Sequence, residues 1–347
     1  MSLKSPKLKS APEVVDTSTL ADYLGLSRWT VSRVLNDQPG VKAATRERVL
    51  KSVKELGFSP NMQARRLKGV PTRLVGVVFQ ELEAPVLADK SAEVQRTLMR
   101  SGHRAVFEIA GGDPSMEIDA IRHFLSIGVD GIVLIGSKMT GEEEIFEMVR
   151  QRGVAIIGVD AREKMGIPSI ELDRATAMIL NINHLFEKGH RRFALLGIRS
   201  DDMYLSRRVR GIRKSLEEKG LNWDESIFEL WDSGKNIQSP DYGYDLGERL
   251  LNSDHPPRAI IALNDRIAMG VMQAIREKGK RIPEDFSIIG FDNLEESAWL
   301  SPPLTSIDQN VSELIDIAGQ HLFKVINGEK VPMVTKIKPR LVERNST

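Results

Sequence analysis

Apolar residues recur at helical spacing early in the chain. The spacing predicts three helices, over residues 17–24, 28–35 and 45–56. Thr17 or Ser18 is expected to cap the first helix, Gly25 to end it and Ser27 to cap the second. Residues 1–15 are rich in Lys, Ser and Pro and have no period, so a disordered tail is predicted there.

Beyond Pro71 the pattern changes to short apolar runs separated by longer amphipathic stretches. The runs are predicted to be strands, at residues 74–79, 105–109, 131–135, 154–159, 192–196, 259–262 and 286–289. Among the intervening stretches, helices are expected at residues 142–151, 174–188, 207–219 and 266–278. Strands that alternate with helices in this way form βαβ units and parallel sheets. About 270 residues of this alternation exceed one hydrophobic core, so two α/β lobes are expected.

Charge is distributed unevenly between these two parts. Residues 1–73 contain 14 Lys and Arg against 6 Asp and Glu, whereas the rest of the chain contains 35 against 42. A basic N-terminal part on an acidic remainder is typical of a protein whose N-terminus meets a polyanion. A solvated basic tail would show the same balance, so charge alone leaves both interpretations open.

Composition narrows the class of protein further. The chain has no cysteine, which excludes disulfide scaffolds and thiolate metal sites and is typical of a reducing compartment. No run of eighteen apolar residues is present, and the basic N-terminus lacks the apolar stretch of a signal peptide. We therefore expect a cytoplasmic protein that has no membrane partner.

Residues 20–35 have the spacing of a helix-turn-helix. The two valines of the second helix share one face, where they can pack on the first helix. Trp29, Arg33 and Asn36 fall on the opposite, outward face. An exposed tryptophan beside arginines suits a surface that meets base edges and phosphates in a major groove. The alternative is a three-helix bundle that carries one exposed aromatic residue.

The segment 60–69 that follows is basic and contains one conspicuous apolar residue, Leu67. It is too short to be a stable helix by itself, but docking against DNA could order it. Leu67 could then enter a minor groove between base steps, while Arg65, Arg66 and Lys68 neutralise phosphates. Taken alone, the segment is better interpreted as a flexible basic linker.

Taken together, these residues resemble the lactose-repressor (LacI/GalR) family of bacterial transcription regulators, over about residues 16–345. In the N-terminal part the resemblance rests on residues 20–27, 30–36, 45–49, 56–61 and 64–67. In the remainder it rests on residues 184–194, 262–270, 287–293 and 302–307.

The resemblance implies an α/β protein with an all-α helix-turn-helix head (16–59), a hinge helix (60–72) and a core of parallel sheets (73–347). That core resembles the periplasmic sugar-binding proteins, in which the chain crosses three times between two lobes. The lobes are expected at residues 73–171 with 308–336 and at residues 172–307 with 337–347.

The resemblance also implies a function. The protein is expected to be a repressor that binds a palindromic operator in double-stranded DNA as a homodimer. A small polar effector, a sugar or sugar derivative, is expected between the core lobes. The implied DNA contacts are Ser27, Arg28, Trp29, Thr30, Arg33, Asn36, Asn61, Ala64, Arg65, Leu67 and Lys68. The implied effector contacts are Gln80, Asp160, Arg208, Asn264 and Asp292, with Gln309 at the edge of the cleft.

Physical reasoning agrees with this effector set. Asp160 and Asp292 each follow an apolar run and are therefore expected at strand C-terminal ends, where open α/β sheets bind ligands. With a guanidinium and a carboxamide, they could distinguish the hydroxyl patterns of a polyhydroxylated ligand. Each aspartate could instead cap a helix or turn, and the register of Arg208 within residues 206–211 is uncertain. Asn264 could be a helix N-cap, a role that is compatible with ligand contact.

Two departures from the family pattern affect these expectations. Lys42 stands where many members have Ser or Thr, so the start of the third helix is capped differently. Residues 80–86 lack the Asn-Pro-Phe-like sequence common at the border of the effector cleft, so no particular sugar is inferred.

The sequence carries no recognisable catalytic or cofactor motif. Phosphate-binding loops, dinucleotide fingerprints and nucleophile elbows are absent, and the six histidines show no metal-ligand spacing. We expect no enzyme activity, no cofactor and no metal. Three alternatives stay open: a ligand-binding or transport protein on the same core, a sugar-metabolising enzyme that uses Asp160 and Asp292 as an acid/base pair, and an activator instead of a repressor.

Overall fold

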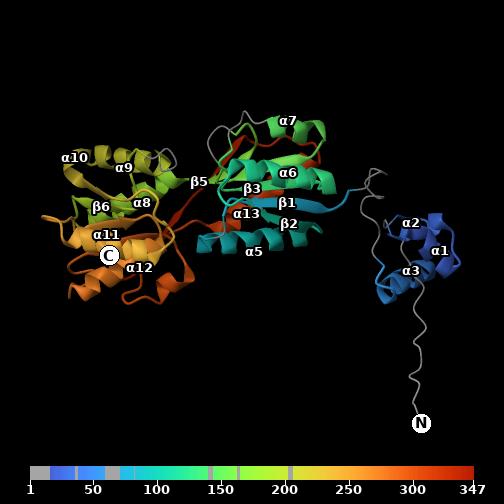
Figure 1. Cartoon of the computed structure of the whole chain (residues 1–347), viewed down its shortest axis with the longest axis horizontal. Helices are drawn as coiled ribbons and strands as arrows, with labels where there is room; N and C mark the ends of the chain where they lie inside the picture. The colour runs from blue at the N-terminus through green and yellow to red at the C-terminus, as the bar shows by residue number, and fades with distance from the viewer. Residues whose placement is uncertain are drawn as a thin grey trace, which may run out of the picture. The chain divides into compact units, whose positions relative to one another are not determined.

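A computed structural model of the chain describes residues 16–35, 38–58, 71–81, 83–139, 144–161, 165–201 and 206–347. The chain divides into two compact units, residues 1–72 and 73–347 (Figure 1). The described part of the first unit is called the head, and the second unit is called the core.

Three short helices form the head: α1 (Thr17–Leu24), α2 (Arg28–Leu35) and α3 (Ala43–Glu55). Leu20, Val31 and Val49, one from each helix, are fully buried and hold the three helices together. Burial of side chains of this size contributes roughly 1.5–3 kcal/mol each. The helical spacing of apolar residues in the sequence therefore predicted the core of the head.

The first helix begins with a cap that differs from the prediction. Asp16, rather than Thr17 or Ser18, is the N-cap, and its Oδ1 accepts from the backbone N–H of Ser18 at 2.7 Å and of Thr19 at 2.8 Å. The backbone N–H of Asp16 donates to Oγ1 of Thr19 at 3.0 Å. An ionised carboxylate also complements the positive end of the helix dipole, which favours Asp16 over a hydroxyl. Gly25 ends the helix with φ 61°, as predicted.

The other two helices begin in different ways. Oγ of Ser27 accepts from the backbone N–H of Thr30 at 3.1 Å and so caps α2, as predicted. Helix α3 begins at Ala43, two residues earlier than expected, and the N-cap residue Lys42 makes no side-chain capping bond. Arg48 Nη2 donates to a carbonyl at the end of α1 at 2.7 Å and ties the first helix to the third.

The core contains two six-stranded sheets. The N-lobe sheet has parallel strands in the spatial order β11 (Val334–Ile337), β5 (Ser169–Leu172), β4 (Ala155–Val159), β3 (Gly131–Ile135), β1 (Leu74–Phe79) and β2 (Arg104–Ile109). Its helices are α5 (Pro85–Arg100), α6 (Pro114–Ile127), α7 (Glu144–Gln151) and α13 (Val311–Ile326). Helices α6 and α7 cover one face of the sheet and α5 and α13 the other (Figure 1).

The C-lobe sheet has the order β12 (Arg340–Val342), β10 (Thr305–Asp308), β9 (Ser287–Asp292), β8 (Ala259–Ala262), β6 (Phe193–Leu196) and β7 (Ile227–Leu230). Strand β12 is antiparallel to β10, and the other pairs are parallel. Its helices are α8 (Arg174–Glu187), α9 (Ser206–Glu218), α10 (Trp223–Ser226), α11 (Pro240–Leu251), α12 (Asp265–Glu277) and the short 3-10 helix η1 (Glu295–Ala298).

Helices α11 and α12 pack unusually closely because glycines face each other at their contact. A Cβ at Gly270 would lie 1.9 Å from the carbonyl oxygen of Pro240, and a Cβ at Gly243 would lie 2.2 Å from that of Ile267. Side chains at either position would push the two helices apart, since backbone atoms cannot give way as a flexible side chain can.

The chain passes three times between the lobes, from β5 to α8, from β10 to α13 and from β11 to β12. In each sheet the strand order reverses beside one strand, β1 in the N-lobe and β6 in the C-lobe. Open α/β sheets bind ligands at the carboxyl ends of strands near such a reversal. The fold therefore directs attention to the residues that end these strands.

Candidate effector cleft and DNA-binding surface

A cavity of about 240 Å³ lies between the strand ends of the two lobes and is called the effector cleft. All of the predicted effector residues line it, and so does Gln309. Gln80 and Asp160 follow β1 and β4 of the N-lobe, whereas Asn264 and Asp292 come from the ends of β8 and β9 of the C-lobe. The structure thus brings together residues that lie far apart in the sequence.

Asp160 is held by two cations. Lys90 Nζ donates to its Oδ2 at 2.6 Å, Arg174 Nη1 to its Oδ1 at 2.8 Å, and the backbone N–H of Leu172 to the same Oδ1 at 3.0 Å. Burial alone would raise the pKa of Asp160, but Arg174 and Lys90 hold it well below its usual range. Asp160 is therefore ionised, and both of its oxygens already accept hydrogen bonds.

Asp292 has different surroundings. It ends β9 with φ 112°, and its Oδ1 accepts from Nε2 of Gln309 at 2.5 Å. Burial raises the pKa of Asp292 to about 6, against the opposing effects of the Gln309 bond and the charge of Arg208. Asp160, with φ 52°, also has a left-handed backbone. Strained backbone of this kind is concentrated at functional sites, where it aims a side chain.

Arg208 projects from α9 into the effector cleft and is 8% exposed. Its Nη1 donates to the carbonyl oxygen of Leu263 at 2.7 Å, and its guanidinium carbon lies 3.9 Å from the ring centroid of Phe291. The register uncertainty of the sequence is thereby resolved, because Arg208 is a buried residue of the cleft wall and not a surface residue.

Asn264 and Gln80, the two predicted effector residues that carry amide side chains, are engaged in polar contacts within the protein and also line the effector cleft. Asn264 is the N-cap of α12: its Oδ1 accepts from the backbone N–H of Ile267 at 2.9 Å, and its Nδ2 donates to the carbonyl oxygen of Ile237 at 2.9 Å. One end of the Gln80 side-chain amide lies 2.5 Å from the carbonyl oxygen of Gly136, and its nitrogen is assigned to that end because only an N–H can donate to the carbonyl. Capping and cleft-lining roles coexist at Asn264.

Sequence reasoning missed two cations of the cleft, Lys90 and Arg174. The signal for Lys90 was present, because it lies four residues from both Val86 and Val94 and all three are buried on one side of α5. A lysine inside an apolar helical stripe needs a buried carboxylate as partner. Arg174 was interpreted as the start of a helix, and no local pattern indicates that it faces Asp160.

A further carboxylate, Asp265, stabilises the loop after β9. It accepts from Oγ of Ser306 at 2.6 Å, from Oγ of Ser297 at 2.7 Å and from the backbone N–H of Leu294 at 2.8 Å. Burial and then the nearby charge of Asp292 raise the pKa of Asp265 to about 7, although these hydrogen bonds oppose the rise. Asp265 therefore positions the chain that carries Asp292.

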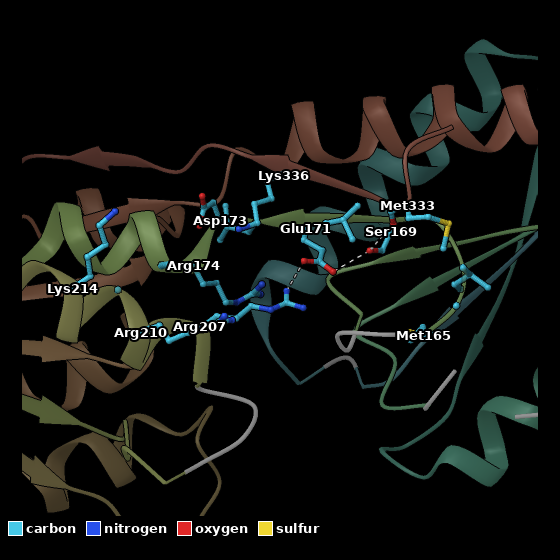
Figure 2. A pocket seen from close by; sticks show the side chains of 16 residues that line it. Met165, Ser169, Glu171, Asp173, Arg174, Arg207, Arg210, Lys214, Met333 and Lys336 are labelled. Carbon is cyan, nitrogen blue, oxygen red and sulfur yellow. Dashed lines mark hydrogen bonds and ion pairs between the residues drawn. The ribbon is translucent and has the colours of Figure 1, made fainter. Parts of the chain in front are cut away.

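A larger cavity, of about 650 Å³, lies beside the connection from β5 to α8 (Figure 2). Its carboxylates already have partners: Arg207 Nη1 lies 2.8 Å from Oε2 of Glu171, and Asp173 caps α8. Arg174 lines both cavities. Although this cavity is larger, it does not lie at the strand ends of both sheets, so size does not identify it as the effector site.

The outward face of α2 carries the predicted DNA contacts of the head. Trp29 is 60% exposed, and Arg28 is exposed beside it. The guanidinium carbon of Arg33 lies 4.6 Å from the ring centroid of Trp29, and its Nε donates to the carbonyl oxygen of Pro39 at 2.8 Å. The remaining contacts of the prediction in this helix region are the capping residues Ser27 and Thr30.

Six of the predicted DNA contacts lie outside the described residues: Asn36, Asn61, Ala64, Arg65, Leu67 and Lys68. Within the described ranges, no group of three or more His, Cys, Asp or Glu side chains is placed to hold a metal ion. No helix of that part of the chain is long and apolar enough to cross a bilayer.

Comparison with known proteins agrees with this architecture. Residues 20–61 match the family model "Bacterial regulatory proteins, lacI family", and residues 182–347 match "Periplasmic binding protein-like domain". Catabolite control protein A of Priestia megaterium is 29% identical over 334 residues, which are 94% of this chain and 98% of the relative. The HTH-type transcriptional repressor PurR of Mannheimia succiniciproducens is 30% identical over 331 residues, 94% of this chain and 97% of the relative.

A solved structure of the Lac repressor dimer bound to operator and the anti-inducer ONPF has a TM-score of 0.81 and 26% identity, covering 94% of this chain and 97% of that one. These relatives are transcriptional regulators rather than enzymes. With its helix-turn-helix head and two-lobed core, the chain belongs to the LacI family and is a DNA-binding transcriptional repressor with an effector-binding core.

Proposed function

We propose that this repressor binds a near-palindromic operator as a homodimer, and that a small polar effector in the effector cleft changes its affinity for that operator. The observation that carries the DNA half of the proposal is the outward Trp29, flanked by Arg28 and Arg33. Their helix is anchored from the other side by the buried Val31 and Val34.

Helix α2 would enter the major groove with this outward face toward the bases. Arginine donates two parallel hydrogen bonds to guanine, and the Trp29 ring offers apolar contact to sugar and thymine methyl groups. A two-fold dimer places two such helices on half-sites one helical turn apart, which requires a near-palindromic operator.

The hinge segment 60–69 would occupy the minor groove between the half-sites. Leu67 is the proposed wedge between base steps, and Asn61, Ala64, Arg65 and Lys68 are the proposed contacts to the groove and phosphates. Folding of this segment only on operator DNA would couple its order to the spacing of the two hinge segments of the dimer, which the arrangement of the core lobes changes.

The proposed dimer has support on the edge of the N-lobe sheet. Phe107 and Ile109 of strand β2 and Met99 of α5 are exposed large apolar residues. Exposed apolar residues beside an edge strand indicate an interaction surface, and a second copy of the chain would cover it. The solved Lac repressor complex, which is similar to this chain, contains a dimer.

The effector half of the proposal rests on the lining of the effector cleft. Its volume of about 240 Å³ lies below the ~300–1,000 Å³ typical of drug-sized ligands, so it suits a molecule of monosaccharide size or smaller. Binding that favours one lobe arrangement changes operator affinity through the three connections, with a coupling of about 1–3 kcal/mol per site.

The DNA half is tested by selecting a preferred duplex from random-sequence DNA and measuring its Kd by fluorescence anisotropy. Trp29→Ala should weaken binding to the selected duplex by about 30-fold, as expected when an aromatic anchor that the interface buries is removed. Trp299→Ala is the matched control, because Trp299 is 82% exposed but belongs to the core. A wild-type protein that shows no sequence preference at moderate salt would contradict the proposal.

The hinge is tested separately with Leu67→Ala. The wedge predicts a larger loss of affinity for the selected duplex than for a scrambled one, because only the specific complex bends the DNA. Equal loss on both duplexes would make the segment a plain basic linker. Sedimentation of the same complex should show two chains on each duplex.

A further inference from the structure

The cavity of about 650 Å³ beside the connection from β5 to α8 is called the crossover cavity. Of its described lining residues, only Arg174 also lines the effector cleft. Its volume falls within the ~300–1,000 Å³ of pockets that hold drug-sized ligands. The crossover cavity is therefore large enough for a ligand of its own, in addition to the one proposed for the effector cleft.

Both lobes contribute walls to the crossover cavity. The N-lobe wall lies within residues 165–172 and 333–336, and the C-lobe wall lies within residues 173–175 and 207–214. Figure 2 shows Arg207 reaching from the C-lobe wall to Glu171 of the N-lobe wall, where Nη1 and Oε2 are 2.8 Å apart. A rearrangement of the lobes would change the distance between these walls, so the crossover cavity has a different shape in each lobe arrangement.

Cations outnumber carboxylates in the crossover cavity. Among the described lining residues, five are cations and two, Glu171 and Asp173, are carboxylates. The two oxygens of Glu171 contact Arg207 and Oγ of Ser169. Both oxygens of Asp173 accept hydrogen bonds from Thr176 at the start of α8. The described lining therefore carries three more positive than negative charges, and its carboxylates are already engaged.

Two of these cations are exposed lysines that approach from different lobes, Lys214 of α9 and Lys336 of β11. Lys214 lies 3.9 Å from Glu218 in an exposed pair on its own helix, which contributes little. Among the described residues, Lys336 forms no ion pair within 4.0 Å. On a convex surface such lysines would only be solvated. A concave surface that carries an excess of one charge focuses its potential, so here the two lysines favour an anion in the cavity.

Apolar side chains complete the lining. Ile167 and Leu172 are buried in the N-lobe wall, whereas Met333 and Val334 are each 53% exposed. Val334 begins β11, which is the edge strand of the N-lobe sheet. Exposed apolar residues that are rimmed by polar ones mark binding surfaces. The crossover cavity thus combines an apolar wall with a cationic rim.

We propose that the crossover cavity is a second ligand site, which binds an organic anion with an apolar body, and that its occupancy changes operator affinity. The carboxylate or phosphate group would lie between Lys214 and Lys336, and the apolar body would lie against Met333 and Val334. A neutral apolar molecule would leave the cations unmatched, and a free inorganic anion would leave the apolar wall uncovered.

The effect on the operator follows from the two-lobed lining and rests on the proposed function. A ligand that contacts walls of both lobes binds one lobe arrangement better than the other, and it therefore shifts the population toward that arrangement. Linkage then requires that the ligand and the operator change each other's affinity by the same factor.

Binding is tested by calorimetry on the full chain without DNA, with 2-naphthyl phosphate and 2-naphthoate as probes. 2-Naphthol lacks the anionic group and inorganic phosphate lacks the apolar body. At least one naphthyl anion should bind about tenfold or more tightly than both of these controls, and the difference from 2-naphthol should shrink with added salt. The two probes distinguish a phosphate from a carboxylate as the preferred group.

Variants assign the binding to the crossover cavity. The double variant Lys214→Glu/Lys336→Glu should weaken it by about tenfold or more, because it reverses two charges of the rim. The matched control is Arg213→Glu/Lys338→Glu, which makes the same charge change at exposed neighbours outside the lining. Arg208→Gln alters the effector cleft and should leave this binding unchanged.

The effect on the operator is measured as the Kd for the selected duplex with and without a saturating naphthyl anion. The Kd should change by about fivefold or more, and the change should disappear in Lys214→Glu/Lys336→Glu. An unchanged Kd at saturation would overturn the regulatory part of the proposal.

Three results would overturn the site itself. They are naphthyl anions that bind no more tightly than 2-naphthol, an equal loss of binding in the two double variants, and a loss of binding in Arg208→Gln instead. Each of them leaves operator selection untouched. Failure of operator selection, in contrast, would contradict the proposed function and leave the calorimetry unaffected.

Discussion

The two carboxylates of the effector cleft occupy corresponding positions in the two lobes but have opposite surroundings. Asp160 follows β4 of the N-lobe and Asp292 ends β9 of the C-lobe, both with a left-handed backbone. Asp160 receives two cations and a backbone N–H, whereas Asp292 receives a neutral amide. The same strand-end position therefore supports two different roles.

The difference indicates that the N-lobe wall of the cleft stabilises the fold, whereas the C-lobe wall is available for ligand binding. On the N-lobe side, Asp160 is saturated and joins the lobes, because Arg174 reaches it from the first helix of the C-lobe. On the C-lobe side, Asp292 and Arg208 keep capacity for additional hydrogen bonds. A ligand would gain most from the C-lobe side, while the N-lobe side resists rearrangement.

The largest expected effect comes from Asp160→Asn. The substitution removes the carboxylate that Lys90 and Arg174 both contact, which should lower the free energy of unfolding by about 3–5 kcal/mol. Urea denaturation of the core measures it. Asp119→Asn is the control, because the Arg122–Asp119 pair is exposed and should contribute less than about 1 kcal/mol. A loss as small as that of the control would show that Asp160 is no more important to the fold than a surface residue.

Lys90→Met should lower the free energy of unfolding by less than Asp160→Asn does. Asp160 keeps Arg174 and its backbone bond, so the loss approximates one hydrogen bond to a charged group, about 1.5–3 kcal/mol. The matched control is Lys278→Met, whose partner Glu248 lies 3.2 Å away in a half-exposed pair. Equal denaturation midpoints for Lys90→Met and Lys278→Met would show that the buried ion pair of the N-lobe wall contributes no more stability than a half-exposed pair.

The pH dependence of stability should come from the C-lobe side. The folded-state pKa of Asp292, about 6, lies above the ordinary 3.8, so the folded form binds a proton more readily than the unfolded form. Its stabilisation is full below the ordinary value and is lost as the pH rises through about 6. Asp160, with a lowered pKa, loses its contribution only in acid.

The measurement is the free energy of unfolding at pH 5.0, 6.0 and 7.5 for the wild type and Asp292→Asn. The difference between the two proteins removes the histidines, which titrate in the same range. It contains the titration of Asp292 together with the lower pKa that Asp265 has once the charge of Asp292 is gone, and it should fall by about 1–2 kcal/mol over this interval. A difference that stays constant with pH would show that Asp292 titrates at its ordinary value.

The smallest change in the free energy of unfolding, and one of opposite sign, is expected for Arg208→Met. Among the described residues Arg208 makes no ion pair within 4.0 Å, although Asp292 and Asp160 act on its charge at longer range. Its removal should therefore leave stability unchanged or raise it by about 1 kcal/mol, which is roughly 2–4 °C in Tm. Arg207→Met should destabilise, since Arg207 pairs with Glu171 across the lobes. A loss above 1 kcal/mol for Arg208→Met would assign Arg208 a structural role.

Local pattern predicted the fold where elements were long or bounded by special residues. The apolar runs at β1, β3, β4 and β8 and the stop at Gly25 were identified because each depends on its immediate neighbours. Strands β5, β7, β10, β11 and β12 were not identified, since each has only three or four residues and contains polar or charged side chains, unlike the uninterrupted apolar run of β8. All of these strands except β7 flank the connections between the lobes, so the geometry of the cleft was not predictable from the sequence pattern.

The sequence by itself determined that Asp160 and Asp292 end apolar runs and so lie at strand ends, because alternation and burial are properties of neighbouring residues. The tertiary structure alone decided that they differ. Asp160 meets Lys90 from 70 positions away and Arg174 from 14 positions away, whereas Asp292 accepts from Gln309 and is influenced by the charge of Arg208. Charge pairing in a buried cleft depends on distances of a few ångströms, which only the folded chain defines.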